Sequence, residues 1–305
     1  MSDASPQGVL VCDKPQGLTS HGVVSRIRRW YGTRKVGHAG TLDPMATGVL
    51  VLGLGRGTKL LGYITGVSKT YLATIRLGSA TPTDDADSDP DLFAEPAALS
   101  AVTDDGIAQG VTALTGPIAQ VPSAVSAIKV NGQRSYARVR AGEDVELKAR
   151  GVEISSFTIL NTRYSVAEGH IDVDVEVDCS SGTYVRALAR DLGNSLGVHG
   201  HLIALRRTRV GAFGIDDAVT IPVDLDAEAP PLTSLAEVAR SLLPTVHVDA
   251  AEAKALMQGK IITTQRNPDQ GDEVAVVCGD ELVSIAAMRA GGGLKSQTAF
   301  AIDLA

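Results

Sequence analysis

One carboxylate, Asp43, stands on a short loop punctuated by glycines, the segment from Gly37 to Gly48 (GHAGTLDPMATG). Glycine permits backbone shapes that residues with a β-carbon resist, and Pro44 keeps Asp43 out of helical geometry. The apolar run 49–52 that follows predicts a buried strand. A carboxylate held on a rigid loop beside a sheet is a candidate nucleophile or general base. A turn aspartate that caps its own backbone would fit the same residues.

Further motifs accompany this loop in order along the chain. They are 9–20 (VLVCDKPQGLTS), 69–78 (KTYLATIRLG) with the acidic turn 83–87 (TDDAD), 121–132 (VPSAVSAIKVNG), 180–186 (SSGTYVR) and 201–208 (HLIALRRT). Together the six motifs resemble those of the bacterial TruB-type tRNA pseudouridine synthases, and the resemblance covers residues 9 to 211. One position departs from the pattern, because the family usually carries an aromatic residue where Val125 stands. A stacking role is therefore not carried over to that position.

The order of elements does not alternate regularly between strands and helices, so a doubly wound parallel sheet is not indicated. The resemblance implies an α+β protein with the pseudouridine synthase fold, a mixed, largely antiparallel sheet flanked by helices, and a small C-terminal β-rich PUA-like domain. We place the catalytic domain at residues 1–240, with an RNA-facing insertion at about 120–152. The PUA-like RNA-binding domain is placed at 241–305, mainly on its position and its short strands.

Local patterns predict several elements that would position these motifs. Residues 131–150 are polar and basic with little periodicity, and we interpret them as a mobile excursion. The three cysteines, at 12, 179 and 278, sit in apolar runs and are expected to be buried. The predicted strands are 9–12, 49–52, 69–77 with Tyr71 on its apolar face, 171–179, 274–278 and 282–287. One helix is predicted to begin at Thr19 or Ser20, one to follow Thr103, and one to span 184–196. Residues 222–244 predict a proline-containing linker followed by a short helix.

Pseudouridylation breaks the glycosidic bond of a uridine and rejoins the same ring through carbon 5. Nothing is oxidised or hydrolysed, so the chemistry requires no metal or organic cofactor, and none is predicted. The resemblance implies that Asp43 does the covalent or proton-transfer work, either on the uracil ring or at the ribose. It also implies that Arg186 pairs with Asp43 and helps to keep the buried carboxylate ionised.

The resemblance gives the other site residues roles around a uracil that is flipped out of the RNA. Tyr71 would stack on the base and take or give a proton, Tyr184 would be a second pocket aromatic, and Leu205 an apolar wall. His38 would occupy the vacated stack in the RNA, and Asp85 would support the pocket. We expect Lys14 and Pro15 to brace the catalytic loop without touching the substrate.

The charge of the chain is unevenly distributed. Net charge is −7, yet residues 12–76 carry ten Lys or Arg against two Asp, and residues 183–210 carry five Arg against one Asp. Polyanion binding depends on the local field, so these stretches suit an RNA partner, which the resemblance implies is the T stem-loop of a tRNA. No run is long enough to span a membrane, and the N-terminus does not resemble a signal peptide. We therefore expect a cytoplasmic enzyme without an obligate protein partner.

Three other features of the sequence suggest rival interpretations. Residues 53–59 (GLGRGTK) hint at a phosphate loop but lack the Walker order, and the acidic turn resembles the start of a calcium loop but has Pro90 where glycine is needed. His199 and His201 lack a third ligand nearby and are expected to be structural. A non-catalytic tRNA-binding or folding module, a nucleotide-dependent enzyme and a guide-RNA-dependent synthase are the alternative functions.

Overall fold

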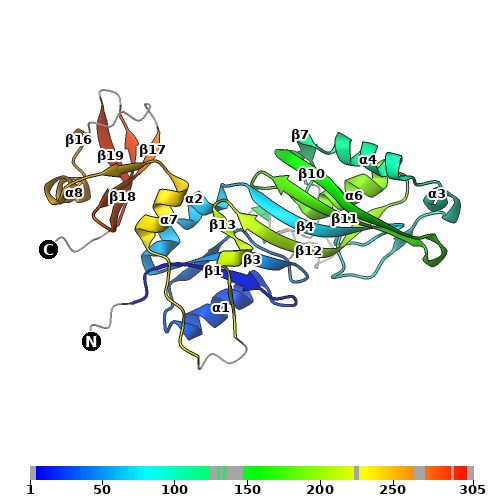
Figure 1. The fold of residues 1–305 in the computed structure, drawn as a ribbon, viewed down its shortest axis with the longest axis horizontal. Coiled ribbons are helices and arrows are strands. Elements are labelled where there is room, and N and C mark those ends of the chain that lie inside the picture. Colours follow the sequence, from blue (N-terminus) through cyan, green and yellow to red (C-terminus); the bar gives the residue numbers. More distant parts are fainter. Residues whose placement is uncertain are drawn as a thin grey trace.

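The structure, a computed structural model, describes residues 5–123, 129–130, 133–134, 147–222, 227–263, 272–289 and 292–300. Among these residues, ten strands form one large sheet and five form a smaller one (Figure 1). The prediction for Val125 lies outside the described residues, and so does the excursion at 131–150 apart from residues 133–134 and 147–150. Two short strands are described in this region, β8 (Lys129–Val130) and β9 (Gln133–Arg134). No helix of the described residues is long and apolar enough to cross a membrane.

The large sheet is mixed and mostly antiparallel, as expected. Its parallel pairs are β1 with β14 and β3 with β12. The pairing of β12 with β3 places the last motif beside the strand that follows the Asp43 loop. In spatial order the strands are β14 (Val219–Thr220), β1 (Gly8–Lys14), β3 (Thr47–Leu54), β12 (Gly200–Val210), β4 (Lys69–Leu77), β11 (His170–Cys179), β10 (Arg150–Ser165) and β7 (Gly116–Gln120); β2 (Val36–Ala39) pairs with β3 and β13 (Phe213–Gly214) with β12.

Two of the helices begin at hydroxyl caps that the sequence predicts. The cap of the first helix is Thr19, whose hydroxyl accepts a hydrogen bond from the Gly22 amide at 2.9 Å. Thr103 caps α4 in the same way through the Gly106 amide at 3.2 Å. The helices are α1 (Ser20–Trp30), α2 (Leu61–Thr65), α3 (Pro96–Ser100), α4 (Asp104–Ala113), α6 (Val185–Ser195), α7 (Leu235–Leu242) and α8 (Ala250–Met257), with 3-10 turns η1 (Gly55–Lys59), η2 (Val166–Glu168) and η3 (Ile215–Asp217).

Three apolar cores lie on the large sheet, one of them shared with the C-terminal domain. Of the other two, one forms where α6 packs on β12 and β4 and α4 packs on β10, and it contains the predicted inward face of β4, including Tyr71 and Ile75. The other lies under α1 and includes Val23 and Ile27, as the helix periodicity predicts. The face of β4 that carries Tyr71 is therefore the face covered by α6, which begins at the predicted site.

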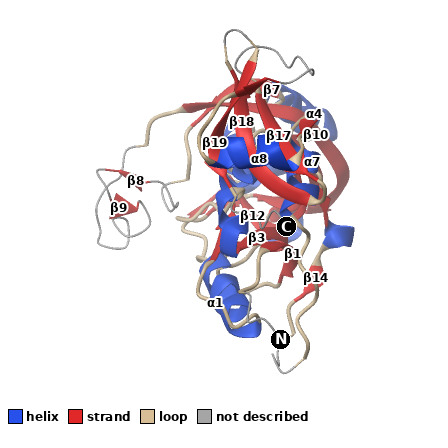
Figure 2. Cartoon of the chain, turned by 90° about the vertical axis from the view of Figure 1, so that its left-hand side faces the viewer, coloured by secondary structure: helices blue, strands red, loops and turns tan. Residues whose placement is uncertain are grey.

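The C-terminal segment forms a β-rich domain of its own. Its strand order is β15 (Thr245–His247), β17 (Glu273–Cys278), β18 (Glu281–Met288), β19 (Gly293–Ala299) and β16 (Ile262–Thr263). Figure 2 views the molecule from this side, with α8 in front of the strands. Cys278 is only partly buried, which corrects the expectation for that residue; Cys12 and Cys179 are buried. Both predicted C-terminal strands are confirmed.

The C-terminal domain packs on the first strands of the chain. Val9 and Val11 of β1 share an apolar cluster with Val277 and Ile285 of the small sheet, with α7 contributing between them. The Lys59 ammonium donates to the Ala299 carbonyl at 2.5 Å. The two sheets are thus joined by a common core as well as by the chain.

Two short strand pairs complete the described elements. Strands β5 (Ser79–Ala80) and β6 (Leu92–Phe93) form a small hairpin around the acidic turn that follows β4. The backbone amide of Leu202 in β12 donates to the Asp84 carbonyl at 3.0 Å. This contact ties the acidic turn to the large sheet, next to the start of α6.

Candidate active site

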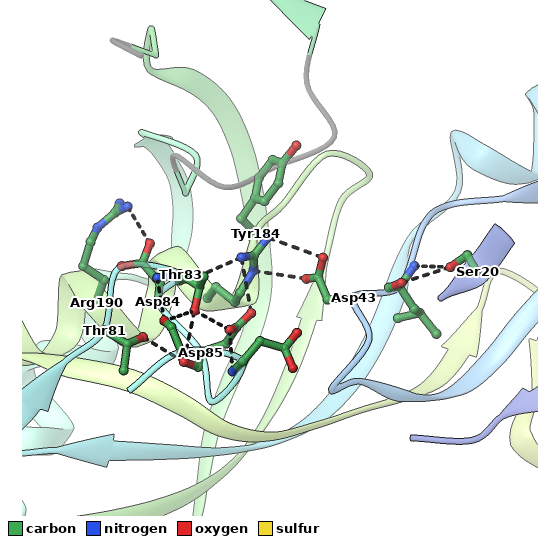
Figure 3. A network of polar contacts seen from close by, with 12 residues as sticks. Ser20, Asp43, Thr81, Thr83, Asp84, Asp85, Tyr184 and Arg190 are labelled. Atoms are coloured by element: carbon green, nitrogen blue, oxygen red, sulfur yellow. Dashed lines mark hydrogen bonds and ion pairs between the residues drawn. The ribbon is translucent and has the colours of Figure 1, made fainter. Parts of the chain in front are cut away.

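The structure brings together Asp43, from the loop between β2 and β3, and Arg186, from the first turn of α6 (Figure 3). The Arg186 Nε lies 3.1 Å from Asp43 Oδ2, and Nη2 lies 3.5 Å from Oδ1. The arginine side chain is only 5% exposed, whereas the aspartate side chain is 35% exposed. The buried cation therefore holds a carboxylate that is still open to an incoming substrate.

Asp85 fixes the other side of the arginine. Its Oδ2 lies 3.3 Å from Arg186 Nη1, which also donates to the Thr83 carbonyl at 2.8 Å. Asp85 is almost fully buried, and its Oδ1 accepts from the Thr83 hydroxyl at 2.6 Å and from the Asp87 amide at 3.0 Å. The acidic turn is thus folded on its own hydrogen bonds, and the pocket-supporting role of Asp85 stays a prediction.

The electrostatics of Asp43 differ from the sequence-based expectation in one respect. Burial raises the pKa of Asp43, and although Arg186 and Lys14 lower it, Asp85 and Asp87 raise it further. The expected pairing with arginine is present, but the net direction of the pKa is upward. A carboxyl whose pKa is moved toward neutrality is better suited to exchange a proton than an ordinary surface aspartate.

The loop that carries Asp43 is braced from beneath. The buried Lys14 ammonium donates to the carbonyls of Pro15 at 3.0 Å, Leu18 at 2.6 Å and Pro44 at 3.3 Å. Burial lowers the pKa of Lys14 to about 8, against the opposing effects of Asp43 and Asp87. These contacts agree with the expected bracing role, in which Lys14 stays away from the substrate.

A second brace was not predicted. The Ser20 hydroxyl accepts from the Leu42 amide at 2.8 Å and donates to the Leu42 carbonyl at 3.0 Å. Sequence reasoning had assigned Ser20 only to the start of a helix. The residue immediately before Asp43 is therefore fixed through both of its backbone polar groups (Figure 3).

Tyr71 lies on β4 and is 7% exposed, with its direct cross-strand neighbour Arg207 on β12. Burial raises the pKa of Tyr71, and the Arg207 guanidinium opposes that effect. Leu205, the predicted apolar wall, is 8% exposed and pairs with Ala73 on the same strand as Tyr71. Leu205 and Met45 both line a groove of about 600 Å³ beside the Asp43 loop.

Tyr184 is the residue that precedes α6, two positions before Arg186. The buried side chain of Gln120 accepts from the Tyr184 amide at 2.8 Å and donates to the Tyr184 carbonyl at 3.1 Å. In the view of Figure 3 the Tyr184 ring stands near Asp43. Sequence reasoning missed Gln120, because a glutamine at the end of a strand carries no signal of a backbone contact 64 residues away.

His38 lies on β2, before the loop, and is half-buried. Its ring meets the ring of His21 edge-on, with centroids 6.3 Å apart. This contact joins β2 to α1 and bears on no RNA. Its expected role in the RNA stack therefore stays a prediction.

The glycines of the suspected phosphate loop have a packing explanation. A β-carbon on Gly57 would lie 2.0 Å from the Gly8 carbonyl oxygen, and one on Gly53 would lie 2.6 Å from the Gly57 backbone. These glycines let the 3-10 turn η1 pack against β1 and β3. His201 is buried and its Nδ1 lies 3.0 Å from the Ser79 carbonyl oxygen, which fits the expected structural role.

This chain is similar to known proteins over most of its length. A model of the N-terminal domain of TruB family pseudouridylate synthases matches residues 28–185, and a model of the tRNA pseudouridylate synthase B C-terminal domain matches residues 186–230. A tRNA pseudouridine synthase B of Paenarthrobacter aurescens (strain TC1) is 56% identical over 255 residues, 84% of this chain and 80% of that protein. One of Corynebacterium diphtheriae (strain ATCC 700971 / NCTC 13129 / Biotype gravis) is 53% identical over 264 residues, 86% and 87% of the two chains.

Solved structures share the fold. The Cbf5 chain matched in a Cbf5-Nop10-Gar1 complex has a TM-score of 0.70 at 24% identity, over 97% of this chain and 85% of that chain. The matches define a pseudouridine synthase, which is an isomerase. The chain belongs to the TruB family of pseudouridylate synthases.

Proposed function

We propose that this enzyme isomerises uridine to pseudouridine at position 55 in the T arm of tRNA, with Asp43 as the nucleophile or base. The observation that carries the proposal is the buried Arg186 paired with a partly open Asp43. A module that only binds tRNA would gain nothing from a carboxylate facing a polyanion, because like charges repel. The relatives that cover most of this chain carry the name tRNA pseudouridine synthase B.

The proposed reaction begins when the target uridine leaves the RNA stack. Removing a base from the stack costs a few kcal/mol, which stacking in the pocket offsets. Tyr71 and Tyr184 supply aromatic faces, Leu205 an apolar wall, and His38 the side chain that fills the vacated place in the RNA. Asp85 keeps Arg186 in position, so that the Asp43 carboxylate is presented in one orientation.

Asp43 then acts either on the uracil ring or at the ribose. In both cases the glycosidic bond to nitrogen 1 breaks, the ring turns within the pocket, and a bond forms from the ribose to carbon 5. The proton leaves carbon 5 and a proton is returned to nitrogen 1, so no oxidant, reductant or nucleotide is consumed. We propose no cofactor and no obligate protein partner.

The first test measures tritium release from an unmodified tRNA transcript labelled at uridine carbon 5. Asp43→Asn should lower the single-turnover rate by about a thousandfold or more, since it removes the reacting oxyanion. Asp178→Asn is a matched control, because Asp178 is also paired with an arginine and its side chain is 34% exposed. Transcript binding should change little in either variant. Substantial turnover by Asp43→Asn would refute the assignment.

Two further arms separate the alternatives. A transcript with cytidine at position 55 should release no tritium from the T arm, and release elsewhere would point to another target. The reaction is run with the transcript and the enzyme alone. Activity that appears only after addition of ATP, or of a guide RNA with its proteins, would favour the nucleotide-dependent or guide-dependent alternative. A wild type that binds tRNA without tritium release would be a binding module.

A further inference from the structure

Arg207 has the largest fully buried side chain among the described residues and is 1% exposed. None of the ion pairs recorded among those residues includes it. Instead, its Nε donates to the Val49 carbonyl at 2.7 Å and its Nη2 to the Gly40 carbonyl at 3.0 Å. Burying a guanidinium costs free energy, so a buried arginine bound mainly to backbone oxygens calls for a specific reason.

The two carbonyls that Arg207 binds stand on either side of Asp43. Gly40 belongs to the start of the catalytic loop and Val49 to the strand that follows it. The Arg207 backbone also touches the loop, because a β-carbon on Gly48 would lie 2.1 Å from the Arg207 carbonyl oxygen. Arg207 therefore fixes both ends of the loop, from its side chain and from its backbone.

The same guanidinium reaches Tyr71. Arg207 and Tyr71 are direct partners in the β12–β4 register, so their side chains leave the sheet on the same face. The Arg207 guanidinium lowers the pKa of Tyr71, although burial keeps that pKa raised overall. Cys179 and Asp43 are the other titratable groups that act on the phenol. Lys69 is close to Arg207, which helps to lower the pKa of the lysine to about 8.

We propose that Arg207 is a positioning residue that locks the Tyr71 phenol to the two ends of the Asp43 loop. This inference rests on the proposed function, in which Tyr71 and Asp43 act on the same uridine. Only a planar cation with several fixed donors can reach two carbonyls and a phenol at once, and a lysine ammonium cannot replace that fork. In the proposed arrangement Arg207 donates to the phenol oxygen, which leaves the phenol's own hydrogen for another acceptor in the pocket.

The test compares Arg207→Lys and Arg207→Gln with Arg209→Lys. Arg209 lies two residues further along β12 and also bonds to β4, through the Thr70 hydroxyl at 2.8 Å, but it has no recorded contact with the loop. Single-turnover tritium release is measured at saturating enzyme. Both Arg207 variants should react about 10- to 100-fold more slowly, with tRNA affinity within about twofold of wild type, whereas Arg209→Lys should react at nearly the wild-type rate.

A double-mutant cycle separates positioning from general destabilisation. In a Tyr71→Phe background, Arg207→Lys should slow the reaction much less than it does in the wild type, because its target hydroxyl is already absent. Fluorotyrosine labelling adds an equilibrium measurement: the Tyr71 fluorine resonance, identified by its loss in Tyr71→Phe, should titrate at higher pH in the Arg207 variants. Equal slowing in both backgrounds, or an unmoved Tyr71 titration, would overturn the proposal.

The outcome is distinguishable from a failure of the proposed function. If Asp43→Asn and Tyr71→Phe remain fully active, the function assigned to the site is wrong. If those variants are impaired while Arg207→Lys matches Arg209→Lys, only the role of Arg207 is wrong. Should both Arg207 variants fail to fold, nuclear Overhauser contacts between the guanidinium hydrogens and the Tyr71 ring are sought in the unsubstituted protein. Their absence would also overturn the proposal.

Discussion

Arg186 and Asp43 are separated by 143 residues of sequence, and their side chains meet at 3.1 Å between Nε and Oδ2. The arginine comes from α6, which packs on β12 and β4, and the aspartate from the loop that leads into β3, the parallel neighbour of β12. The position of the carboxylate therefore depends on both halves of the large sheet being assembled.

Replacing Arg186 with lysine should disable the site even though the charge is kept. A single ammonium cannot reach Asp43, Asp85 and the Thr83 carbonyl together, so the single-turnover rate should fall by about 100-fold or more. The Asp43 pKa should also rise, since the cation that lowers it is displaced. Arg190→Lys, one turn further along α6, is the control, and a similar loss in that variant would show that the helix as a whole is sensitive.

The pH dependence of the reaction should report the raised pKa of Asp43. Activity requires the ionised carboxylate, so the rate should fall as pH drops through a value above that of an ordinary aspartate. Asp87→Asn removes a negative neighbour that raises the Asp43 pKa, so it should move this acid limb to lower pH. Single-turnover rates across a pH series measure it. A limb that moves upward, or stays in place, would contradict the electrostatic account.

Substitutions at Tyr71 should separate chemistry from base stacking. Tyr71→Phe keeps the ring and loses the hydroxyl, so the single-turnover rate should fall while tRNA affinity is kept. Tyr71→Ala should weaken both, because stacking of a base on an aromatic ring contributes about 1–3 kcal/mol. Equal rates for Phe and Tyr would leave stacking as the sole role of this residue.

Loss of the Lys14 ammonium should destabilise the fold. Lys14→Met would leave three carbonyls without their donor and should lower the free energy of unfolding by about 2–4 kcal/mol. Lys35→Met, at an exposed lysine, should stay within about 0.5 kcal/mol of wild type. Chemical denaturation of the three proteins measures these differences. A Lys14 variant as stable as the Lys35 variant would exclude bracing by this residue.

The stabilisation by Lys14 should also depend on pH. Its pKa is lowered to about 8 from 10.5, so between those values the unfolded chain binds a proton that the folded chain has lost. The free energy of unfolding of the wild type relative to Lys14→Met should therefore rise as pH increases from about 8 to about 10.5. Denaturation at pH 7 and pH 9.5 tests the sign.

Removal of residues from about 245 onward should weaken tRNA binding more than it slows the bound reaction, because the proposed site residues all precede residue 212. The structure predicts that the truncation also destabilises the remaining fold. Val9 and Val11 would lose apolar neighbours in the small sheet, so the truncated enzyme should also unfold at lower denaturant concentration. A folded truncation that has lost its single-turnover rate would place part of the active site in the tail.

The sequence predicted the parts of the fold where one signal dominates. Strict alternation in β11 and β4, and hydroxyl caps at Thr19 and Thr103, each identified an element. The sixteen-residue strand β10 was not predicted, because its register shifts against β11 at Ile154/Ser156 and Ile159/Asn161 interrupt the alternation. A bulge changes which residues face the core, so the apolar–polar alternation that identifies a strand in the sequence is lost.

The site was predicted unevenly for a similar reason. The resemblance identified Asp43 and Arg186, which meet as expected, and Asp85 beside them. Ser20 and Gln120 were missed because their partners are backbone groups, and a backbone amide has no residue-type signature. Contacts of that kind become visible only when the chain is folded.

The cluster that Val9 and Val11 share with Val277 and Ile285 has a consequence for biosynthesis. During translation the first strand leaves the ribosome long before the last strands exist. Part of its apolar surface on that side stays uncovered until β17 and β18 have emerged. A nascent chain stalled before residue 273 should expose these apolar side chains, which makes it a target for holding chaperones. Emergence of β17 and β18 then completes the cluster around β1.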